Sequence, residues 1–280
     1  MEKIQIHMSD GVALTADRAG PENGPRVILA HGGGQTRFAW RAAATALAGA
    51  GYQTLSYDAR GHGESDWSPD NRYPIARRWK DMEEIIQQYG SPFAVVGASM
   101  GAGSILYGPQ QGCRPAAVVL VDMTPNPNRA GMNRVREFMA SGLGGFASVE
   151  EAADAVADYN PDRPRPKDTN GLLKNLRQRS DKRFYWHWDP GMLDLDIDLE
   201  REMLERTFAT LEDLPDIPLL LVRGMSSDVV PDAAAQGFRA RVPWAEVCEI
   251  ERAGHMVAGD RNDVFQEAVI GFLGRVLPAF

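Results

Sequence analysis

Short apolar runs that alternate with helical segments are the feature that most constrains how this chain folds. The runs Arg26–Ala30, Phe93–Val96 and Ala116–Val121 are apolar almost throughout, and the same rhythm returns at Pro218–Arg223 and Ala245–Glu249. Apolar strands of this length, separated by helices, are typical of a parallel sheet that is covered by helices on both faces. The sequence therefore predicts an α/β fold with a mostly parallel central sheet flanked by helices.

A turn signal in the first twenty residues predicts one antiparallel element. Ile4–Met8 and Val12–Asp17 are short strand-like runs, and Ser9-Asp10-Gly11 stands between them. Two such runs around an Asp-Gly pair are typical of a β-hairpin. We therefore expect a β-hairpin over these residues.

The alternation of apolar strands and helices is interrupted between residues 124 and 215. This stretch has no apolar strand run and consists of helical pieces joined by proline-rich loops. We therefore expect a core domain formed by residues 1–124 and 215–280, interrupted by a helical cap insertion over residues 125–214.

The composition disfavours several classes of function. The 280 residues suit one large domain, and a formal charge of −8 with no block of Lys or Arg argues against binding to nucleic acid. No apolar run approaches the ~20 residues that cross a bilayer, and the first residues contain no apolar signal segment. The two cysteines, Cys113 and Cys248, make no disulfide framework. We expect a cytoplasmic protein that binds neither nucleic acid nor membranes, and the sequence does not define its oligomeric state.

The segment Gly97-Ala98-Ser99-Met100-Gly101 combines a serine with a sharp change from strand to helix. It directly follows an apolar run and precedes a stretch of small residues with helical character. A serine on such a turn projects its hydroxyl above the edge of the sheet, and the glycines around it let the backbone pass without Cβ clashes. We expect Ser99 to be a nucleophile. The alternative is a structural serine in a glycine turn.

A glycine-rich loop follows the strand that we expect beside this serine. His31-Gly32-Gly33-Gly34 comes directly after Arg26–Ala30. A tetrahedral intermediate needs two N–H donors where its negative charge develops, and a helix N-terminus adds its positive dipole. We expect the backbone N–H groups of Gly33 and Met100 to form this oxyanion hole, while His31 packs in the loop. The alternative is a loop that only turns the chain.

A serine hydroxyl needs a base that accepts its proton, and five histidines are candidates. His255 lies in an Ala-Gly-His-Met segment, after the last predicted strand and before the last predicted helix. Loops at the carboxyl edge of an α/β sheet carry the reactive groups. We expect His255 to be the general base, and we expect His7 and His62 to be structural.

Two aspartates compete for the role of orienting the base. Asp228 follows a predicted strand, and the order Ser99, Asp228, His255 matches one of the known chain orders of a Ser-His-Asp triad. Asp122 ends another predicted strand and would reach the same histidine from the neighbouring position. We expect Asp228 to be the acid, with Asp122 as the alternative.

Taken together, these motifs resemble the α/β-hydrolase superfamily. The match consists of HGGG, DARGHGES, GASMG, SSDVV and AGHM, in this order, and it covers residues 1–124 and 215–280. The insertion is similar to the caps of the esterase, C–C hydrolase, haloperoxidase-like and epoxide hydrolase branches. In the epoxide hydrolase and haloalkane dehalogenase branches the elbow residue is Asp, so Ser99 favours acyl transfer. The resemblance implies a carboxylic ester hydrolase that uses no metal and no organic cofactor.

Aromatic residues of the expected cap are candidates for contact with the substrate. Trp186, His187 and Trp188 lie in the unusual segment FYWHW. The two indoles would wall an apolar pocket, and the imidazole would supply a polar contact. Phe38 and Trp40, just after the glycine loop, are candidates for the same cavity. The alternative is that these side chains pack the cap onto the core domain or belong to the core.

The expected function is cleavage of a small-molecule carboxylic ester or lactone through an acyl-enzyme intermediate. The large aromatic cap leaves a macrocyclic lactone, such as a macrolide antibiotic, as an alternative substrate. The same triad would also serve a C–C bond hydrolase, or a cofactor-free haloperoxidase or perhydrolase. A non-catalytic small-molecule receptor and an interaction scaffold are the remaining alternatives.

Overall fold

The computed structural model of the chain describes residues 1–161, 165 and 167–279. Its centre is an eight-stranded sheet with the strand order β1-β2-β4-β3-β5-β6-β9-β10. The strands are β1 (Glu2–His7), β2 (Ala13–Ala19), β3 (Arg26–Ala30), β4 (Gln53–Tyr57), β5 (Phe93–Ala98), β6 (Ala117–Val121), β9 (Leu219–Gly224) and β10 (Glu246–Ile250). β1 and β2 pair antiparallel with their neighbours, and the other pairs of this sheet are parallel.

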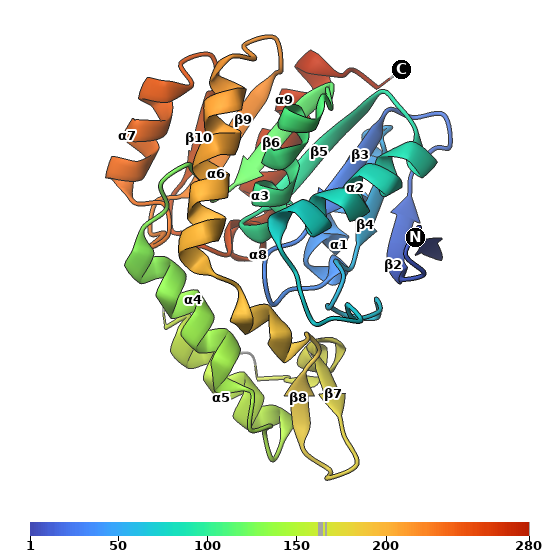
Figure 1. The fold of residues 1–280 in the computed structure, drawn as a ribbon, viewed down its shortest axis with the longest axis vertical. Helices are drawn as coiled ribbons and strands as arrows, with labels where there is room; N and C mark the ends of the chain where they lie inside the picture. The colour runs from blue at the N-terminus through green and yellow to red at the C-terminus, as the bar shows by residue number, and fades with distance from the viewer. Residues whose placement is uncertain (162–164, 166, 280) are drawn as a thin grey trace.

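Helices cover both faces of the sheet (Figure 1). Successive residues of β3 point to opposite faces, because Ile28 belongs to a cluster with α2, α3, α6 and α7, and Leu29 to a cluster with α1, α8 and α9. The helices are α1 (Arg41–Gly49), α2 (Ile75–Tyr89), α3 (Met100–Tyr107), α6 (Ile197–Glu212), α7 (Asp232–Arg241), α8 (Val257–Asp260) and α9 (Asn262–Val276), with the 3-10 helices η1 (Arg37–Trp40) and η2 (Gly108–Gln111). The predicted α/β fold is confirmed.

Glycines end two of these elements where the sequence predicts a turn. Gly11, between β1 and β2, has a φ of +87°, and the two strands pair antiparallel as expected. Gly51 follows α1 with a φ of +95°, which is a left-handed conformation of the kind that ends many helices. Both positions need a backbone that a residue with a Cβ adopts only with strain.

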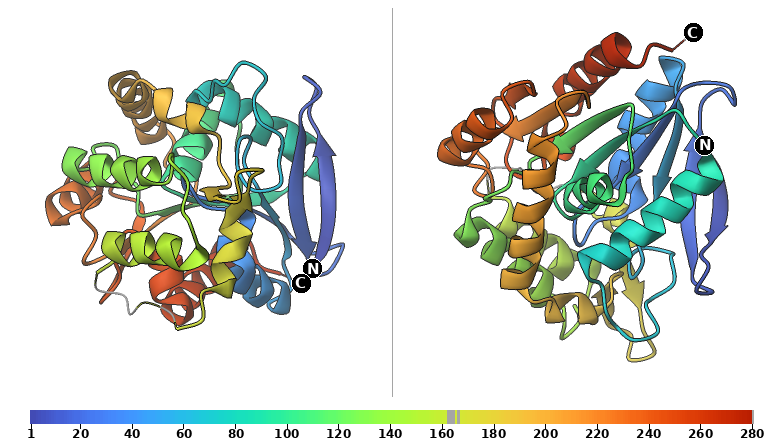
Figure 2. Two further views of the ribbon diagram at one scale, coloured as in Figure 1. Left: turned by 90° about the horizontal axis from the view of Figure 1, so that it is seen from below. Right: turned by 45° about the horizontal axis from the view of Figure 1, so that its top comes forward.

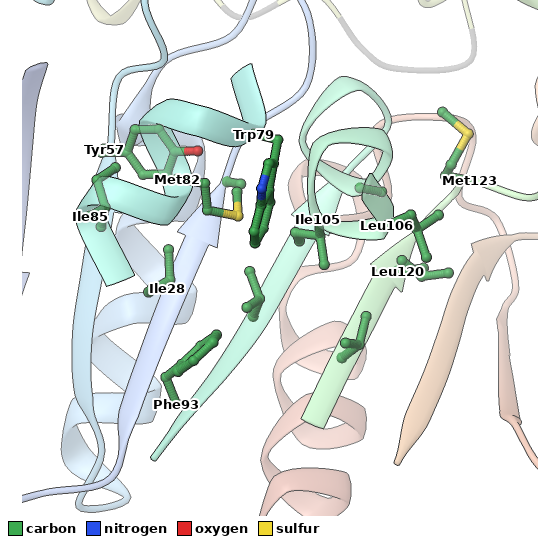
Figure 3. Packing of buried hydrophobic residues seen from close by; sticks show 14 of the residues in the cluster. Ile28, Tyr57, Trp79, Met82, Ile85, Phe93, Ile105, Leu106, Leu120 and Met123 are labelled. Atoms are coloured by element: carbon green, nitrogen blue, oxygen red, sulfur yellow. The ribbon is translucent and has the colours of Figure 1, made fainter. Parts of the chain in front are cut away.

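One of the two clusters fixes the strands that lead to the candidate site. Figure 3 shows Trp79 and Met82 from α2 and Ile105 from α3 together with Ile28 and Leu120 from the sheet. Each of these side chains is at most 4% exposed. Because α3 directly follows β5, this packing also fixes the turn between them.

The segment between β6 and α6 forms a layer beyond the sheet, which we call the cap. It contains α4 (Arg129–Ser141), α5 (Val149–Tyr159), η3 (Asn170–Asn175), β7 (Leu176–Gln178), β8 (Phe184–Trp186) and η4 (Pro190–Asp194). These elements lie below the sheet in Figure 1 and in front of it in the view from below in Figure 2. The expectation of an entirely helical insertion does not hold, because β7 and β8 pair antiparallel. Strands of three residues are too short to give a recognisable periodicity.

The helix α6 falls within the stretch that we expected to form the cap, but it packs on the sheet. Leu204, Phe208 and Leu211 are at most 7% exposed and belong to the same cluster as Ile105 of α3. Their spacing of four and three residues is typical of one face of a helix. The spacing predicts the helix, but it does not say which surface this face covers.

Replacing Phe208 by Ala tests whether α6 is part of the core. Phe208 is fully buried, and loss of a buried Phe side chain typically costs about 3–5 kcal/mol. We expect the free energy of unfolding, measured by urea titration, to fall by an amount in this range. Leu199→Ala, at an exposed position of the same helix, is the control and should change it by less than about 0.5 kcal/mol. A small effect of Phe208→Ala would show that α6 is not held by the core.

Candidate active site

Ser99 lies in a sharp turn between β5 and α3. Its φ of +45° is in the left-handed region, which a non-glycine residue adopts only with strain. A Cβ on Gly97 would come within 2.7 Å of the nitrogen of Ala102, and a Cβ on Gly101 within 2.3 Å of the carbonyl oxygen of Ala30. The two glycines therefore allow the close backbone approach that this turn requires.

Asp122 follows β6 in an equally unusual conformation. Its φ is +51°, its side chain is fully buried, and its Oδ1 accepts a hydrogen bond from the N–H of Gly224 over 3.2 Å. β5 and β6 are parallel neighbours, and the N–H of Ser99 donates to the carbonyl oxygen of Val121 over 3.1 Å. The serine and the aspartate therefore leave the sheet side by side at its carboxyl edge.

His255 reaches the same edge from the loop after β10. Its Nδ1 lies 2.7 Å from Oδ2 of Asp122. This contact favours the tautomer with the proton on Nδ1, which leaves Nε2 as an acceptor. The carboxylate is 0% exposed and the imidazole side chain 9%, so solvent screens the interaction only weakly.

The structure corrects the expectation that Asp228 orients His255 and pairs the imidazole with the alternative, Asp122. The carboxylate of Asp228 lies 3.2 Å from Nη1 of Arg134 in α4, and it is 38% exposed. Gly131 of the same helix approaches the Asp228 backbone so closely that a Cβ there would stand 2.4 Å from the carbonyl oxygen. Asp228 therefore joins the loop after β9 to the cap, whereas Asp122, which follows β6, contacts the imidazole of His255.

Ser227 completes the surroundings of Asp122, although none of the predictions from the sequence included this residue. Its hydroxyl donates to Oδ2 of Asp122 and accepts from the N–H groups of Val229 and Val230 over 3.1 Å each. Donors around a buried carboxylate hold its orientation and supply the hydrogen bonds that solvent cannot reach to make. The signal that would have identified this residue is the polar Ser-Ser pair in the loop that follows the apolar strand β9.

The glycine loop after β3 lies beside the serine. A Cβ on Gly32 would stand 3.5 Å from the Cβ of Ser99. Gln35 closes the loop, because its side chain accepts from the N–H of Gly32 over 2.9 Å and its own N–H donates to the carbonyl oxygen of Gly32 over 3.1 Å. Met100 is the first residue of α3, so its N–H has no partner within the helix. This arrangement supports Gly33 and Met100 as oxyanion donors, and these two roles stay predictions.

Three buried histidines pack together next to the site: His31 at the start of the glycine loop, His62 in the loop after β4, and His187 in the cap. The rings of His31 and His62 have centroids 4.9 Å apart, and the ring of His187, from the cap, lies 5.9 Å from that of His62. Each residue is at most 1% exposed. Burial lowers the pKa of all three, neighbouring imidazoles lower that of His62 further, and the pKa of His187 falls to about 3. The three imidazoles are therefore neutral at pH 7.

The aromatic segment of the cap is packed, as the alternative interpretation held. Trp186 and Trp188 stack with ring centroids 5.1 Å apart and are 5% and 3% exposed. Trp188 also lies against the glycine loop, because a Cβ on Gly34 would come within 3.3 Å of its ring. His187 was expected to contact a substrate, but its Nδ1 accepts a hydrogen bond from the N–H of Gly63 over 2.6 Å. Its position beneath the loops corrects that expectation.

Phe38 and Trp40 do not share a cavity, which corrects the expectation that both line the substrate site. Trp40 is 1% exposed and packs with Phe265 of α9, at a ring separation of 5.9 Å, in the core on the α1 and α9 face. Phe38 is half-buried, and the guanidinium groups of Arg37 and Arg41 lie 4.3 and 5.0 Å from its ring centre. Trp40 is therefore a core residue, whereas the ring of Phe38 makes cation–π contacts with two arginines.

The thiols of the chain are poor competitors for the role of nucleophile. Cys113 and Cys248 are both free, and burial raises the pKa of each thiol. A raised pKa leaves little thiolate at neutral pH, and the thiolate is the reactive form. Within the described residues, no set of His, Cys, Asp or Glu side chains is arranged to hold a metal ion, and no helix is long and apolar enough to cross a bilayer.

A comparison with known protein families identifies the class of this protein. The sequence pattern of the alpha/beta hydrolase family matches residues 27–268. The chain belongs to this family, as its motifs suggested, and it is a hydrolase.

Individual relatives match over most of the chain. Esterase Rv0045c of Mycobacterium tuberculosis is 29% identical over 93% of this chain and 86% of its own length. The sn-1-specific diacylglycerol lipase ABHD11 of Mus musculus is 27% identical over 89% of this chain and 81% of its own length. The crystal structure of an alpha/beta hydrolase from Novosphingobium aromaticivorans superposes with a TM-score of 0.80, covering 96% of this chain and 97% of that chain at 23% identity. This last likeness shows the common fold.

Acid should destabilise the protein through the three buried histidines. Their pKa values are lowered in the folded state, so the unfolded chain binds more protons below pH ~6.5. Their contribution to stability is complete above this pH and is lost as the pH falls, by up to about 1.4 kcal/mol per pH unit for each histidine. Urea titrations between pH 7 and 5 measure this slope. We expect His187→Asn to reduce this slope by nearly the ~1.4 kcal/mol per pH unit that one proton contributes. Ser180→Ala, which changes an exposed residue without a titratable group, should leave the slope unchanged. Equal slopes for all three proteins would contradict the assignment.

Proposed function

We propose that this chain is a serine esterase that cleaves a carboxylic ester or lactone through an acyl-enzyme intermediate. Ser99 is the nucleophile, His255 is the general base, and Asp122 orients and stabilises the imidazole. The N–H groups of Gly33 and Met100 form the oxyanion hole. The observation that carries the proposal is the 2.7 Å contact between His255 and Asp122 at the sheet edge where β5 presents Ser99.

In the first half of the reaction, Oγ of Ser99 attacks the carbonyl carbon while Nε2 of His255 accepts the hydroxyl proton. The buried carboxylate of Asp122 stabilises the imidazolium that forms, because little solvent screens the pair. Negative charge moves to the carbonyl oxygen, where the N–H groups of Gly33 and Met100 and the dipole of α3 stabilise it. The imidazolium then gives its proton to the leaving alcohol.

In the second half, a water molecule attacks the acyl group on Ser99. His255 accepts a proton from this water, and the oxyanion hole receives the second tetrahedral intermediate. The imidazolium returns the proton to Oγ of Ser99 as the carboxylic acid leaves. One water is consumed for each ester that is split, and the enzyme returns to its starting state.

Two observations favour an ester with an apolar acyl group. The relatives include proteins named esterase and diacylglycerol lipase. Apolar cap side chains bound the glycine loop, because a Cβ on Gly33 would lie 3.7 Å from the sulfur of Met139 and a Cβ on Gly34 would lie 3.3 Å from Trp188. An acyl group held at the oxyanion donors would therefore meet an apolar surface.

The macrocyclic lactone receives less support than an open-chain ester. That alternative rested on the large aromatic cap, whose most unusual segment carries Trp186 and Trp188. The two rings instead stack on each other and are 5% and 3% exposed. We therefore propose open-chain esters and small lactones as the first substrates to test.

Replacing Ser99 by Ala tests the nucleophile. Without the hydroxyl no acyl-enzyme forms, and kcat on a p-nitrophenyl ester should fall by a factor on the order of 10⁴ or more. Covalent labelling by a fluorophosphonate, followed by intact-mass spectrometry, should disappear in parallel. Ser180→Ala, at an exposed position in the turn between β7 and β8, is the matched control and should retain both. Full turnover in a folded Ser99→Ala variant would refute the proposal.

Two Asp→Asn substitutions identify the acid. Asp122→Asn should lower kcat by a factor on the order of 10⁴, because the neutral amide no longer holds the productive tautomer of His255 or stabilises its cation. Asp228→Asn weakens a partly exposed ion pair with Arg134, so kcat should stay within about threefold. Steady-state kinetics at the same pH compares the kcat of the two variants, and the larger loss identifies the acid. A larger loss with Asp228→Asn would restore Asp228 as the acid.

A further inference from the structure

His187 connects the cap to the loop after β4. Its Nδ1 accepts a hydrogen bond from the N–H of Gly63 over 2.6 Å, and the residue is 1% exposed. The same loop carries His62, whose Nε2 accepts from the N–H of Gly34 over 3.1 Å. The contacts therefore run from the cap, through the loop after β4, to the glycine loop beside the nucleophile.

His31 makes the reciprocal connection between the two loops. Its Nδ1 lies 2.8 Å from the carbonyl oxygen of Gly32, and its Nε2 accepts from the N–H of Ala59 over 2.9 Å. Each loop thus supplies an imidazole that accepts a backbone N–H of the other. A ring nitrogen accepts from a backbone N–H only when it carries no proton, and it donates to a carbonyl oxygen only when it carries one. These partners therefore define the tautomers. Only neutral imidazoles can make this set of contacts.

We propose that His187 is a positioning residue for the oxyanion hole, acting through Gly63 and His62 on Gly34 and hence on the adjacent N–H of Gly33. The inference rests on the proposed function, because it concerns a donor in the same reaction. It gives the cap a second role besides bounding the acyl site. A displacement of about 1 Å in a group that stabilises the transition state can cost ~10²-fold in rate, so a small loosening of the loop would be measurable.

The cap also contacts the glycine loop directly, which adds a further constraint on the geometry of this loop. Trp188 and Met139 of α4 both pack on Gly34, because a Cβ there would stand 3.3 Å from the ring of Trp188 and 3.4 Å from Cγ of Met139. The side chain of Gln35 holds the loop from the other side through the sulfur of Met256, 3.0 Å away. Three successive glycines restrict the backbone very little, so the geometry of this loop depends on such outside contacts.

The surroundings of His187 keep the ring in its neutral form. Burial lowers its pKa most, and the neighbouring imidazole of His31 and the guanidinium of Arg177 in β7 lower it further. The backbone of Gly34 opposes these effects in part, and the pKa is about 3. The acceptor nitrogen therefore stays unprotonated throughout the pH range in which a histidine base works.

The test compares His187→Leu, which removes the acceptor, with His187→Asn, whose Oδ1 replaces Nδ1 as an acceptor that takes no proton at neutral pH. On a p-nitrophenyl ester, His187→Leu should lower kcat about 10- to 100-fold and change KM less than about threefold, because the contact acts in the transition state. The Ki of an alkyl trifluoromethyl ketone, whose adduct on Ser99 places an oxyanion in the same hole, should rise by the factor by which kcat/KM falls. His187→Asn should restore all of these values to within about threefold.

A merely structural role of His187 predicts different results. It would lower the melting temperature and leave the kcat and Ki of the folded protein unchanged. Values within twofold of wild type in folded His187→Leu would overturn the proposal, and so would a His187→Asn variant as impaired as His187→Leu. Phe146→Leu, at a buried cap position that packs on Trp186, is the control. It should lower the melting temperature and keep kcat.

An NMR measurement tests the connection without turnover and without a variant. In the native protein at pH 7, the ¹⁵N signals of the imidazoles should show the proton on Nε2 of His187 and on Nδ1 of His62. A protonated ring or the opposite tautomer at either residue would overturn the proposal even where the esterase assignment holds. Full activity in Ser99→Ala would instead refute the proposed function and leave these tautomers as a separate result, so the two failures are distinguishable.

Discussion

The parallel register of β5, β6 and β9 is the constraint on which the candidate site depends. These strands are neighbours that run in the same direction, so the residues that follow them emerge at one edge of the sheet. Ser99 and Asp122 both leave their strands with a positive φ, at +45° and +51°. Such conformations cost on the order of 1–3 kcal/mol each and persist only where the surrounding packing holds them. The apolar core around β5 and α3 supplies that packing, and Ser227 and His255 then meet the carboxylate from the next two strands.

The loops at this edge are held from outside their own sequence. A run of three glycines has little stiffness of its own, and its shape is defined by imidazoles, by Gln35 and by the cap side chains Met139 and Trp188. The cap in turn is anchored where Arg134 meets Asp228 and where the N–H of Asn128 donates to the carbonyl oxygen of Val229 over 2.8 Å. Packing of the cap and geometry of the site are therefore parts of one structure.

Local signals in the sequence predict much of this arrangement, and long-range packing decides the rest. The hairpin turn, the apolar strands and the elbow around Ser99 each depend on residues that are close in sequence, and they lie where expected. The acid does not follow from such signals, because Asp122 and Asp228 both come after a strand at the same edge, and only the path of the loop that carries His255 distinguishes them. In the same way, the sequence of an aromatic segment such as the one around Trp186 is the same whether its rings line a cavity or stack in a core, so it does not distinguish the two.

A crystal structure of the adduct with a fluorophosphonate is the sharpest test of the proposed site, because it shows the reacting atoms in place. We expect phosphorus bound to Oγ of Ser99, with the phosphoryl oxygen within hydrogen-bonding distance of the N–H groups of Gly33 and Met100. The imidazole of His255 should stand between the adduct and the carboxylate of Asp122. Phosphorus on another side chain would refute Ser99 as the nucleophile, and a phosphoryl oxygen turned away from both N–H groups would refute the proposed oxyanion hole.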